Sequence, residues 1–441
     1  MVAVKLLALV ASVGAPNDFV NRVPTHVGRR TYPAQSIRIS TGETSKRPES
    51  VLCTHIALKS RRFVEQGFKA LHLHRFDSKS NHWSNLYSSG ESARVLTSRI
   101  LLRRKSSMMK AAVRAQTRKI VFSNNEPIPH PGSKRVRLRV MAASVNPIDY
   151  KFFKMSLGKY VGMDVAGIVD AVGSGVDNFF VGDEVFGIID VGQSGSIAEY
   201  CICKADALHL THKPKNLAWD KAAGSVVTYV TAYGALTDSS KAGMRQGDSV
   251  LIIGASGGCG LAGVQLAKAL KASEIVGVCS SANHDLVLRN GATRCVDYRD
   301  QDAYAKMIQK DKFDVIFDTV TGSAPGINYW PDGRKLLKPD RRCRHVCTSS
   351  TYLQLFASLF GLTKRQKSVF MDMNHIGSDL QTIYKLLGNT IDTQFDRIVF
   401  LTEQGVKEAF ERMASTRTTG KIVFSLRNAG ESTDVSIVRS E

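Results

Sequence analysis

The sequence predicts an α/β protein in which an all-β region is followed by a doubly wound parallel sheet. Across residues 250–322, short apolar runs alternate with helical patterns, which is typical of parallel strands joined by helices. Across residues 110–214, short alternating strands are separated by glycine turns, which indicates antiparallel pairing. The 441 residues suffice for two ordinary domains and an extension.

The first quarter of the chain differs in composition from the rest. The net formal charge is +21, and most of the excess lies in residues 1–110, which hold 19 Lys or Arg and 6 Asp or Glu. An apolar stretch of signal-peptide length is followed by Ser- and Arg-rich sequence that resembles an organelle transit sequence or disorder. A wrongly extended gene model, with a start at Met108 or Met109, is a third interpretation. None of these predicts a folded domain.

Location follows from the same segment. If residues 1–108 are translated, we expect a mitochondrial or plastid protein, and otherwise a cytoplasmic one. No apolar run approaches the ~20 residues of a membrane span. The aromatic residues among the basic ones are too few to predict nucleic-acid binding.

The cysteines indicate reduced thiols rather than a metal site. Eight cysteines are scattered without a CxxC pair, which is typical of an intracellular protein. The pairs at 201–203 and 343–347 lack zinc-site spacing. We therefore expect no metal at these cysteines.

The stretch VLIIGASGGCG at residues 250–260 indicates a dinucleotide site. Residues 250–253 have the pattern of a buried parallel strand, and apolar residues from Leu261 onward recur at helical spacing. Backbone N–H groups and the positive end of a helix dipole favour phosphate at such a turn. Ala255 stands where the first glycine is usual, Gly257 permits close approach of the pyrophosphate, and Gly260 permits close helix packing. The predicted cofactor contacts are Ala255, Ser256, Gly257, Gly258, Cys259 and Gly260. The alternative is a tight turn without a ligand.

The next strand bears on the choice of nucleotide. Residues 275–279 form an apolar run that ends in SSANHD, so Ser280, Ser281 and Asn283 lie where the adenosine ribose is expected. No acid precedes Asp285, and hydroxyls can donate hydrogen bonds to a 2′-phosphate that a carboxylate would repel. NADPH is therefore favoured over NADH. Arg299 is a candidate for the missing basic partner, and the alternative is a polar loop after a strand.

Two further strand–helix units complete the sheet. A short helix at 285–292 ends at Gly291, a strand follows at 293–298, a helix at 303–310 and a strand at 313–322. Ligands in such sheets lie beyond the carboxyl ends of the strands. The residues expected near the cofactor on this ground are Tyr298, Asp318, Thr319 and Val320. For each of them an ordinary strand-end loop residue is the alternative.

Several motifs resemble those of a known superfamily. MKAAV, ASVNPIDY, GMDVAGIVDAVGSGVDNFFVGDEVFG, TAYGAL and GASGGCG are similar to the medium-chain dehydrogenase/reductase superfamily, in its zinc-free quinone oxidoreductase and zeta-crystallin-like branch. The resemblance covers residues 109–424. It implies a GroES-like β domain plus a Rossmann domain, and family members are often dimers or tetramers, so a homodimer is expected. The implied boundaries are an extension at 1–108, the GroES-like catalytic domain at 109–217, the Rossmann NADPH-binding domain at 218–386, a return to the catalytic domain at 387–428 and a tail at 429–441.

The resemblance also implies the site residues. Where zinc members carry ligands, this chain has Asn146, Met163 and Asp164, and an amide and a thioether are poor zinc ligands, so no zinc is expected. Asn146 is implied to lie beside the nicotinamide and the substrate, where it can donate to a developing oxyanion, and Thr231 to face the carboxamide. The alternative for Asn146 is a turn residue before Pro147.

The proton donor is less defined. Tyr150 and Tyr160 are candidates, although packing in a loop is the alternative for each, and Asp149 is expected to order the loop. Only 12 residues separate Asp149 from Gly162, fewer than is usual in the family, so the acceptor pocket is expected to differ. Arg341 and Arg342 replace a glycine-bearing turn and are candidates for a phosphate contact, with a solvated turn as the alternative.

The predicted function is an NADPH-dependent, zinc-independent oxidoreductase that transfers hydride to a quinone or an α,β-unsaturated carbonyl. Such acceptors need no Lewis acid, unlike the alcohols of the zinc enzymes. One alternative is an enoyl-thioester reductase with the same fold and cofactor. The other is an NADPH-binding sensor or scaffold without catalysis.

Overall fold

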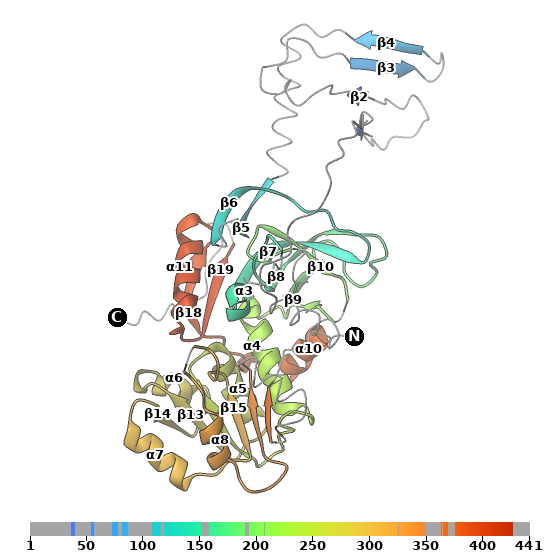
Figure 1. Ribbon diagram of the computed structural model, residues 1–441. Helices are drawn as coiled ribbons and strands as arrows, with labels where there is room; N and C mark the ends of the chain where they lie inside the picture. Colours follow the sequence, from blue (N-terminus) through green and yellow to red (C-terminus); the bar gives the residue numbers. More distant parts are fainter. Residues whose placement is uncertain are drawn as a thin grey trace, which may run out of the picture. The chain divides into compact units, whose positions relative to one another are not determined.

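The chain divides into two compact units, 1–104 and 105–441. The computed structural model describes four short strands of the first unit, and residues 108–115, 119–151, 158–189, 194–206, 208–324, 326–348, 363, 365–368 and 375–426 of the second (Figure 1). The four strands form two antiparallel pairs, β1 (Ile37–Ile39) with β2 (Thr54–Ile56) and β3 (Leu73–Asp77) with β4 (His82–Leu86). These pairs were not predicted from the sequence.

A seven-stranded sheet forms the first part of the second unit. Its order is β11-β9-β8-β7-β19-β18, and β10 also pairs with β7. The strands are β7 (Arg135–Val145), β8 (Asp164–Val172), β9 (Glu184–Ile188), β10 (Tyr200–Lys204), β11 (Leu210–His212), β18 (Phe395–Phe400) and β19 (Lys421–Ser425). All pairs are antiparallel except β18 with β19. The predicted all-β region is thus confirmed, and β18 and β19 from the end of the chain join it.

A pair of strands and a short helix flank this sheet. β5 (Met108–Arg114) and β6 (Ile120–Pro127) form an antiparallel pair. Helix α3 (Pro147–Lys151) begins two residues after β7 ends, so Asn146 lies at the junction. The second half of β7 is buried without alternation because it lies between β8 and β19 and under a helix.

A six-stranded parallel sheet forms the second part, with the order β14-β13-β12-β15-β16-β17. The strands are β12 (Ser249–Ile253), β13 (Glu274–Cys279), β14 (Arg294–Asp297), β15 (Val315–Asp318), β16 (Arg344–Cys347) and β17 (Gln366–Ser368). This is the 3-2-1-4-5-6 order of a doubly wound dinucleotide-binding sheet. The first four strands are those predicted from the sequence.

Helices cover the two sheets. They are α4 (Trp219–Thr237), α5 (Gly258–Ala269), α6 (His284–Arg289), α7 (Gln301–Lys310), α8 (Trp330–Leu336), α10 (Ile376–Leu387) and α11 (Glu403–Ala414). The helices predicted at 285–292 and 303–310 correspond to α6 and α7. Helix α4 packs on β7, β8 and β9 of the first sheet and also on α5 and α10 (Figure 1). One apolar core of buried side chains therefore runs through both parts.

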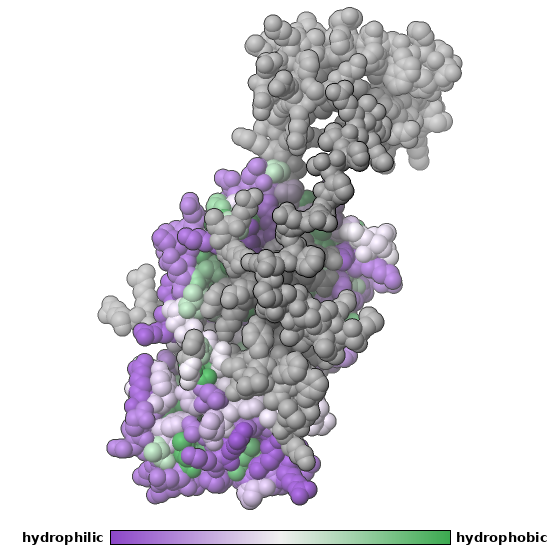
Figure 2. Space-filling model, viewed as in Figure 1, coloured by the Kyte–Doolittle hydropathy of each residue, from purple (hydrophilic) through white to green (hydrophobic). Residues whose placement is uncertain are grey.

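The coloured residues of the second unit in Figure 2 are mainly hydrophilic, with apolar residues in small patches. The largest apolar exposures among the described residues are those of Phe180, Val181 and Phe400. None of the described helices combines the length and the hydropathy that a membrane span needs.

Candidate active site

The turn after β12 is closed by Gly254, which the sequence analysis did not assign. Its φ is +80°, and a Cβ there would lie 2.3 Å from Val320 Cγ2. The turn that needs a glycine thus lies at Gly254, one residue before Ala255. Ala255 is buried and its amide donates to the Val278 carbonyl at 3.0 Å, so that amide is not available to a phosphate. The sequence could have indicated Gly254, because it directly follows Ile253, the last residue of β12.

The other glycines leave room for a ligand and for the helix. A Cβ on Gly260 would lie 2.1 Å from the Gly254 carbonyl oxygen, so the first turn of α5 packs directly on the strand turn. At Gly257 the nearest atom to such a Cβ is 3.4 Å away. The amides of Cys259 and Gly260 lie in the first turn of α5, where they have no acceptor within the helix. The Gly258 amide instead faces Gly420, because Gly257 and Gly420 form a parallel β-bridge. This arrangement fits a pyrophosphate.

Three predicted cofactor residues from two loops meet at the carboxyl edge of the sheet. Asn283 Nδ2 donates to Ser256 Oγ at 3.3 Å and to Ser280 Oγ at 3.1 Å. The Ser281 amide donates to Asp297 Oδ2 at 2.8 Å, a contact that the sequence analysis missed. Hydrogen bonds from the Arg299 and Ser281 amides lower the pKa of Asp297. An ionised carboxylate therefore lies beside the expected ribose position.

The sequence analysis named three candidate arginines, of which Arg341 is exposed in the turn before β16. Arg299 lies 5.4 Å over the ring of Tyr298, which is exposed at the same edge. Arg342 pairs with Asp248 at 2.9 Å and Asp314 at 3.0 Å, residues that precede β12 and β15. Those are the amino ends of the strands, opposite the glycine turn, so the suggestion that Arg342 reaches a cofactor phosphate was wrong.

Asp318 does not face the cofactor edge, contrary to prediction. Its carboxylate is fully buried and accepts from the Val320 and Thr321 amides at 2.9 Å, from Thr321 Oγ1 at 2.6 Å and from His345 at 3.1 Å. Burial would raise the pKa of Asp318, but the hydrogen bonds from His345 and Thr321 hold it below its ordinary value. Thr319 Oγ1 donates to the Ile253 carbonyl at 2.9 Å, and so this loop supports the glycine turn.

Asn146 lies at the centre of a buried polar cluster. Its Nδ2 donates to Asp164 Oδ2 at 2.8 Å, its Oδ1 accepts from Lys421 Nζ at 2.7 Å, and its amide donates to Asp149 Oδ2 at 2.7 Å. Asp164 also accepts from Ser144 Oγ at 2.5 Å. Lys421 was not predicted, because it lies 275 residues from Asn146 in the sequence. Asp149 orders the loop, as expected.

The cluster holds two carboxylates away from solvent. Burial raises the pKa of Asp149 to about 7, against the hydrogen bond from the Asn146 amide, and the charge of Asp164 adds to the effect. Asp164 Oδ1 is buried and has no hydrogen-bond partner within the described part of the chain. A further donor at that atom would complete the cluster.

Tyr160 is held outside this cluster. Its hydroxyl donates to Glu126 Oε2 at 3.0 Å, which Lys159 Nζ also contacts at 2.6 Å. Burial and this bond raise the pKa of Tyr160 to about 12. The geometry thus disfavours Tyr160 as the proton donor. The side chain of Tyr150 lies outside the described residues, and Thr231 lies buried on α4.

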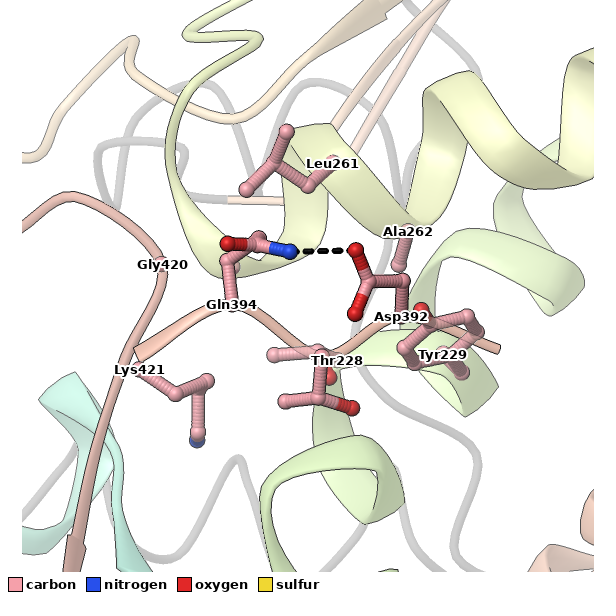
Figure 3. A pocket seen from close by; sticks show the side chains of 10 residues that line it. Thr228, Tyr229, Leu261, Ala262, Asp392, Gln394, Gly420 and Lys421 are labelled. Carbon is pink, nitrogen blue, oxygen red and sulfur yellow. Dashed lines mark hydrogen bonds between the residues drawn. The ribbon is translucent and has the colours of Figure 1, made fainter. Parts of the chain in front are cut away.

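A water-sized cavity of about 10 Å³ adjoins the cluster. It lies between α4, α5 and residues 392–421, the returning chain, which runs back to the first sheet after α10. Figure 3 shows Gly420 and Lys421 on one side and Tyr229 with Asp392 on the other. The Gly420 amide donates to the Ser256 carbonyl at 2.9 Å. The returning chain therefore joins the Asn146 cluster to the glycine turn.

Comparisons with known proteins agree with this geometry. Residues 132–231 match the alcohol dehydrogenase GroES-like domain, and residues 290–424 match a zinc-binding dehydrogenase domain. Among the described residues, no three His, Cys, Asp or Glu side chains are grouped as metal ligands. The quinone oxidoreductase of Coxiella burnetii has a similar structure, with a TM-score of 0.61, 26% identity, and coverage of 73% of this chain and 100% of that one.

Sequence relatives cover part of the chain. A 2-methylene-furan-3-one reductase of Solanum lycopersicum is 36% identical over 45% of this chain and 53% of its own. The mitochondrial reticulon-4-interacting protein 1 of Caenorhabditis elegans is 32% identical over 58% and 75%. A quinone oxidoreductase of Lama guanicoe is 36% identical over 43% and 59%. With its GroES-like domain, parallel dinucleotide-binding sheet and these relatives, the chain belongs to the medium-chain dehydrogenase/reductase superfamily, in the quinone oxidoreductase-like branch.

Proposed function

We propose that this protein is an NADPH-dependent, zinc-independent reductase of quinones or α,β-unsaturated carbonyls. The observation that carries the proposal is the buried Asn146 cluster, which the returning chain joins to the glycine turn of α5. The relatives named as quinone oxidoreductases and as a 2-methylene-furan-3-one reductase support this substrate class.

The chain's own residues account for cofactor binding. Gly257 leaves space for the pyrophosphate, and the first-turn amides of α5 donate to it. The Ser280 hydroxyl favours a 2′-phosphate, whereas Asp297, which is hydrogen-bonded to Ser281, opposes it, so the preference for NADPH over NADH is expected to be moderate. The reduced nicotinamide supplies the hydride.

At the acceptor, Asn146 is the donor. One of its two Nδ2 hydrogens is bound by Asp164, which leaves the other to meet negative charge that develops on an acceptor oxygen. Quinones and enones place such an oxygen in conjugation with the carbon that accepts hydride, and they do not require a Lewis acid. Orientation of the two reactants can lower the barrier by ~7–11 kcal/mol.

An enoyl-thioester reductase is the second candidate. A trans-enoyl reductase of Aspergillus terreus is 26% identical over 70% of this chain and 92% of its own. Such a substrate needs the same cofactor and the same donor to the thioester oxygen. The two candidates therefore differ in the acceptor pocket and not in the Asn146 cluster.

The experiment is oxidation of NADPH and NADH by the full chain with quinones, enones and enoyl thioesters. We expect Asn146→Ala to lower kcat by about 100- to 1000-fold, because one oxyanion donor is lost. Its NADPH dissociation constant should not change. Asn124→Ala, at an exposed position on β6, is the control. Tight nucleotide binding without turnover of any acceptor would contradict the proposal and favour the sensor or scaffold.

A further inference from the structure

Lys421 is a buried lysine at the reaction site whose three hydrogens have partners. The residue is 4% exposed and opens β19. Its Nζ donates to Asn146 Oδ1 at 2.7 Å and to the Val145 carbonyl at 3.0 Å, and it lies 3.4 Å from Asp164 Oδ2. Burying an ammonium is costly unless its bonds are all made, so this side chain has a defined position.

The backbone holds Lys421 from both sides. Gly420 has φ +70°, and a Cβ there would lie 2.3 Å from the Gln394 carbonyl oxygen. On the other side, a Cβ on Gly258 would lie 3.0 Å from Lys421 Cδ, so the lysine stem packs against the first turn of α5. The ammonium therefore lies between the phosphate-binding helix and Asn146.

The chemistry of the partners sets the orientation of the Asn146 amide. A lysine ammonium only donates hydrogen bonds, so the Asn146 Oδ1 must face Lys421, and Nδ2 then faces Asp164. The Lys421 ammonium, hydrogen-bonded to Oδ1, draws electron density from the amide and makes its remaining N–H a stronger donor. Reversal of the amide would leave a buried ammonium facing an NH₂ group.

We propose that Lys421 is a positioning residue for hydride transfer, which clamps the Asn146 amide against Asp164 and strengthens the amide N–H that meets the acceptor oxygen. The inference rests on the proposed function, because it needs an acceptor whose oxygen becomes anionic. Lys421 acts through Asn146 and makes no contact with substrate of its own.

The first test uses the free protein and needs no turnover. In protein labelled with ¹⁵N-asparagine, the Asn146 side-chain signals are identified by their loss in Asn146→Ala. We expect Lys421→Met to shift these two signals and to speed their hydrogen exchange, because the clamp is lost. Lys407→Met, at an exposed lysine of α11, is the control. Unshifted Asn146 signals in Lys421→Met would overturn the clamp, even for a chain that turns over no acceptor.

The second test is a double-mutant cycle on kcat. We expect Lys421→Met to lower kcat by about 10- to 100-fold, with an unchanged NADPH dissociation constant and a larger primary isotope effect from deuterated NADPH. In a chain that already carries Asn146→Ala, Lys421→Met should lower kcat by less than about twofold. If the kcat losses of the two single variants multiply in the double variant, Lys421 acts independently of Asn146. An unchanged kcat in Lys421→Met would show that the lysine has only a structural role.

Lys421→Gln provides the variant that keeps a donor without the charge. It should restore part of the kcat lost in Lys421→Met and should return the Asn146 signals toward their original positions. If Lys421→Met does not fold, Lys421→Gln alone decides the proposal, since a kcat and spectrum equal to those of the unmodified chain would contradict it.

Discussion

At the scale of single residues, glycines of the same turn have different roles. The atoms that a methyl group would meet separate them. Gly260 faces backbone at 2.1 Å, whereas Gly257 faces only the Gly254 carbonyl at 3.4 Å. Gly257 also has an extended conformation, φ −78° and ψ 167°, that alanine adopts without strain.

Alanine at these two positions should therefore separate binding from stability. Gly257→Ala is expected to keep the melting temperature within about 2 °C and to weaken NADPH binding by at least about tenfold, because the methyl occupies the pyrophosphate approach. Gly260→Ala is expected to lose about 2–4 kcal/mol of stability through backbone displacement. Thermal unfolding with nucleotide titration measures both, and equal melting temperatures for the two variants would contradict this assignment.

Asp149 gives a second prediction at this scale. Its pKa is about 7 in the fold against an ordinary value of 3.8, and burial is the main cause. Between about pH 4 and about pH 7 the unfolded chain loses this proton while the folded chain keeps it, so stability falls as pH rises, by at most about 4 kcal/mol. Above about pH 7 this contribution stays constant.

Asp149→Asn should remove that part of the pH profile. Urea unfolding across pH 4 to 8 is the measurement. The free energy of unfolding of the variant should rise relative to that of the unmodified chain as pH rises toward about 7. Asp177→Asn, at an exposed position, should leave the profile unchanged. Parallel profiles for Asp149→Asn and the unmodified chain would show that this carboxyl ionises normally.

At the scale of elements, one buried carboxylate ties the returning segment together. Asp396 on β18 accepts from Arg412 Nε at 2.9 Å and Nη2 at 2.7 Å, at the end of α11, and from the Thr419 amide at 3.0 Å, just before β19. Burial would raise the pKa of Asp396, but the bonds from Arg412 and Thr419 keep it low. These contacts position the strand that carries Lys421.

Arg412→Met should therefore loosen β18, α11 and β19 together. Arg412→Met removes two of the hydrogen bonds to this carboxylate and leaves Arg397, whose Nε lies 3.2 Å from Asp396 Oδ1, as its charged partner. The expected loss of stability is therefore about 1–3 kcal/mol. Arg417→Met, at an exposed neighbouring arginine, should cost less than about 0.5 kcal/mol. The free energy of unfolding measures both, and hydrogen exchange should locate the effect in residues 395–425. Equal losses in the two variants would contradict the role of Asp396.

At the scale of the whole molecule, the chain has two units, and the apolar clusters of the described residues lie between Met109 and Phe424. A chain that comprises residues 105–441 is therefore expected to unfold cooperatively and to bind NADPH with the affinity of the full chain. Circular dichroism and nucleotide titration are the measurements. A tenfold loss of affinity would show that residues 1–104 contribute to the site.

The order of the elements could be predicted from the sequence. The strands β12 to β15, helices α6 and α7 and the phosphate turn follow from apolar periodicity and glycine placement, which act over a few residues. Ser256, Ser280 and Asn283 were also grouped correctly, because the carboxyl ends of neighbouring parallel strands share one edge. Motif resemblance supplied the superfamily, which the comparisons confirm.

Only the tertiary structure decided which side chains meet. Asp318 turns inward to His345 across neighbouring strands, and Asp297 reaches Ser281 from the adjacent strand, although nothing in the local sequence distinguishes these carboxylates. Lys421 meets Asn146 because β19 returns to pair with β7, with Ile422 opposite Val145. Periodicity reports the environment of each residue, whereas the partner of a buried charge depends on sheet pairing between distant segments, and that pairing is settled only when the chain folds.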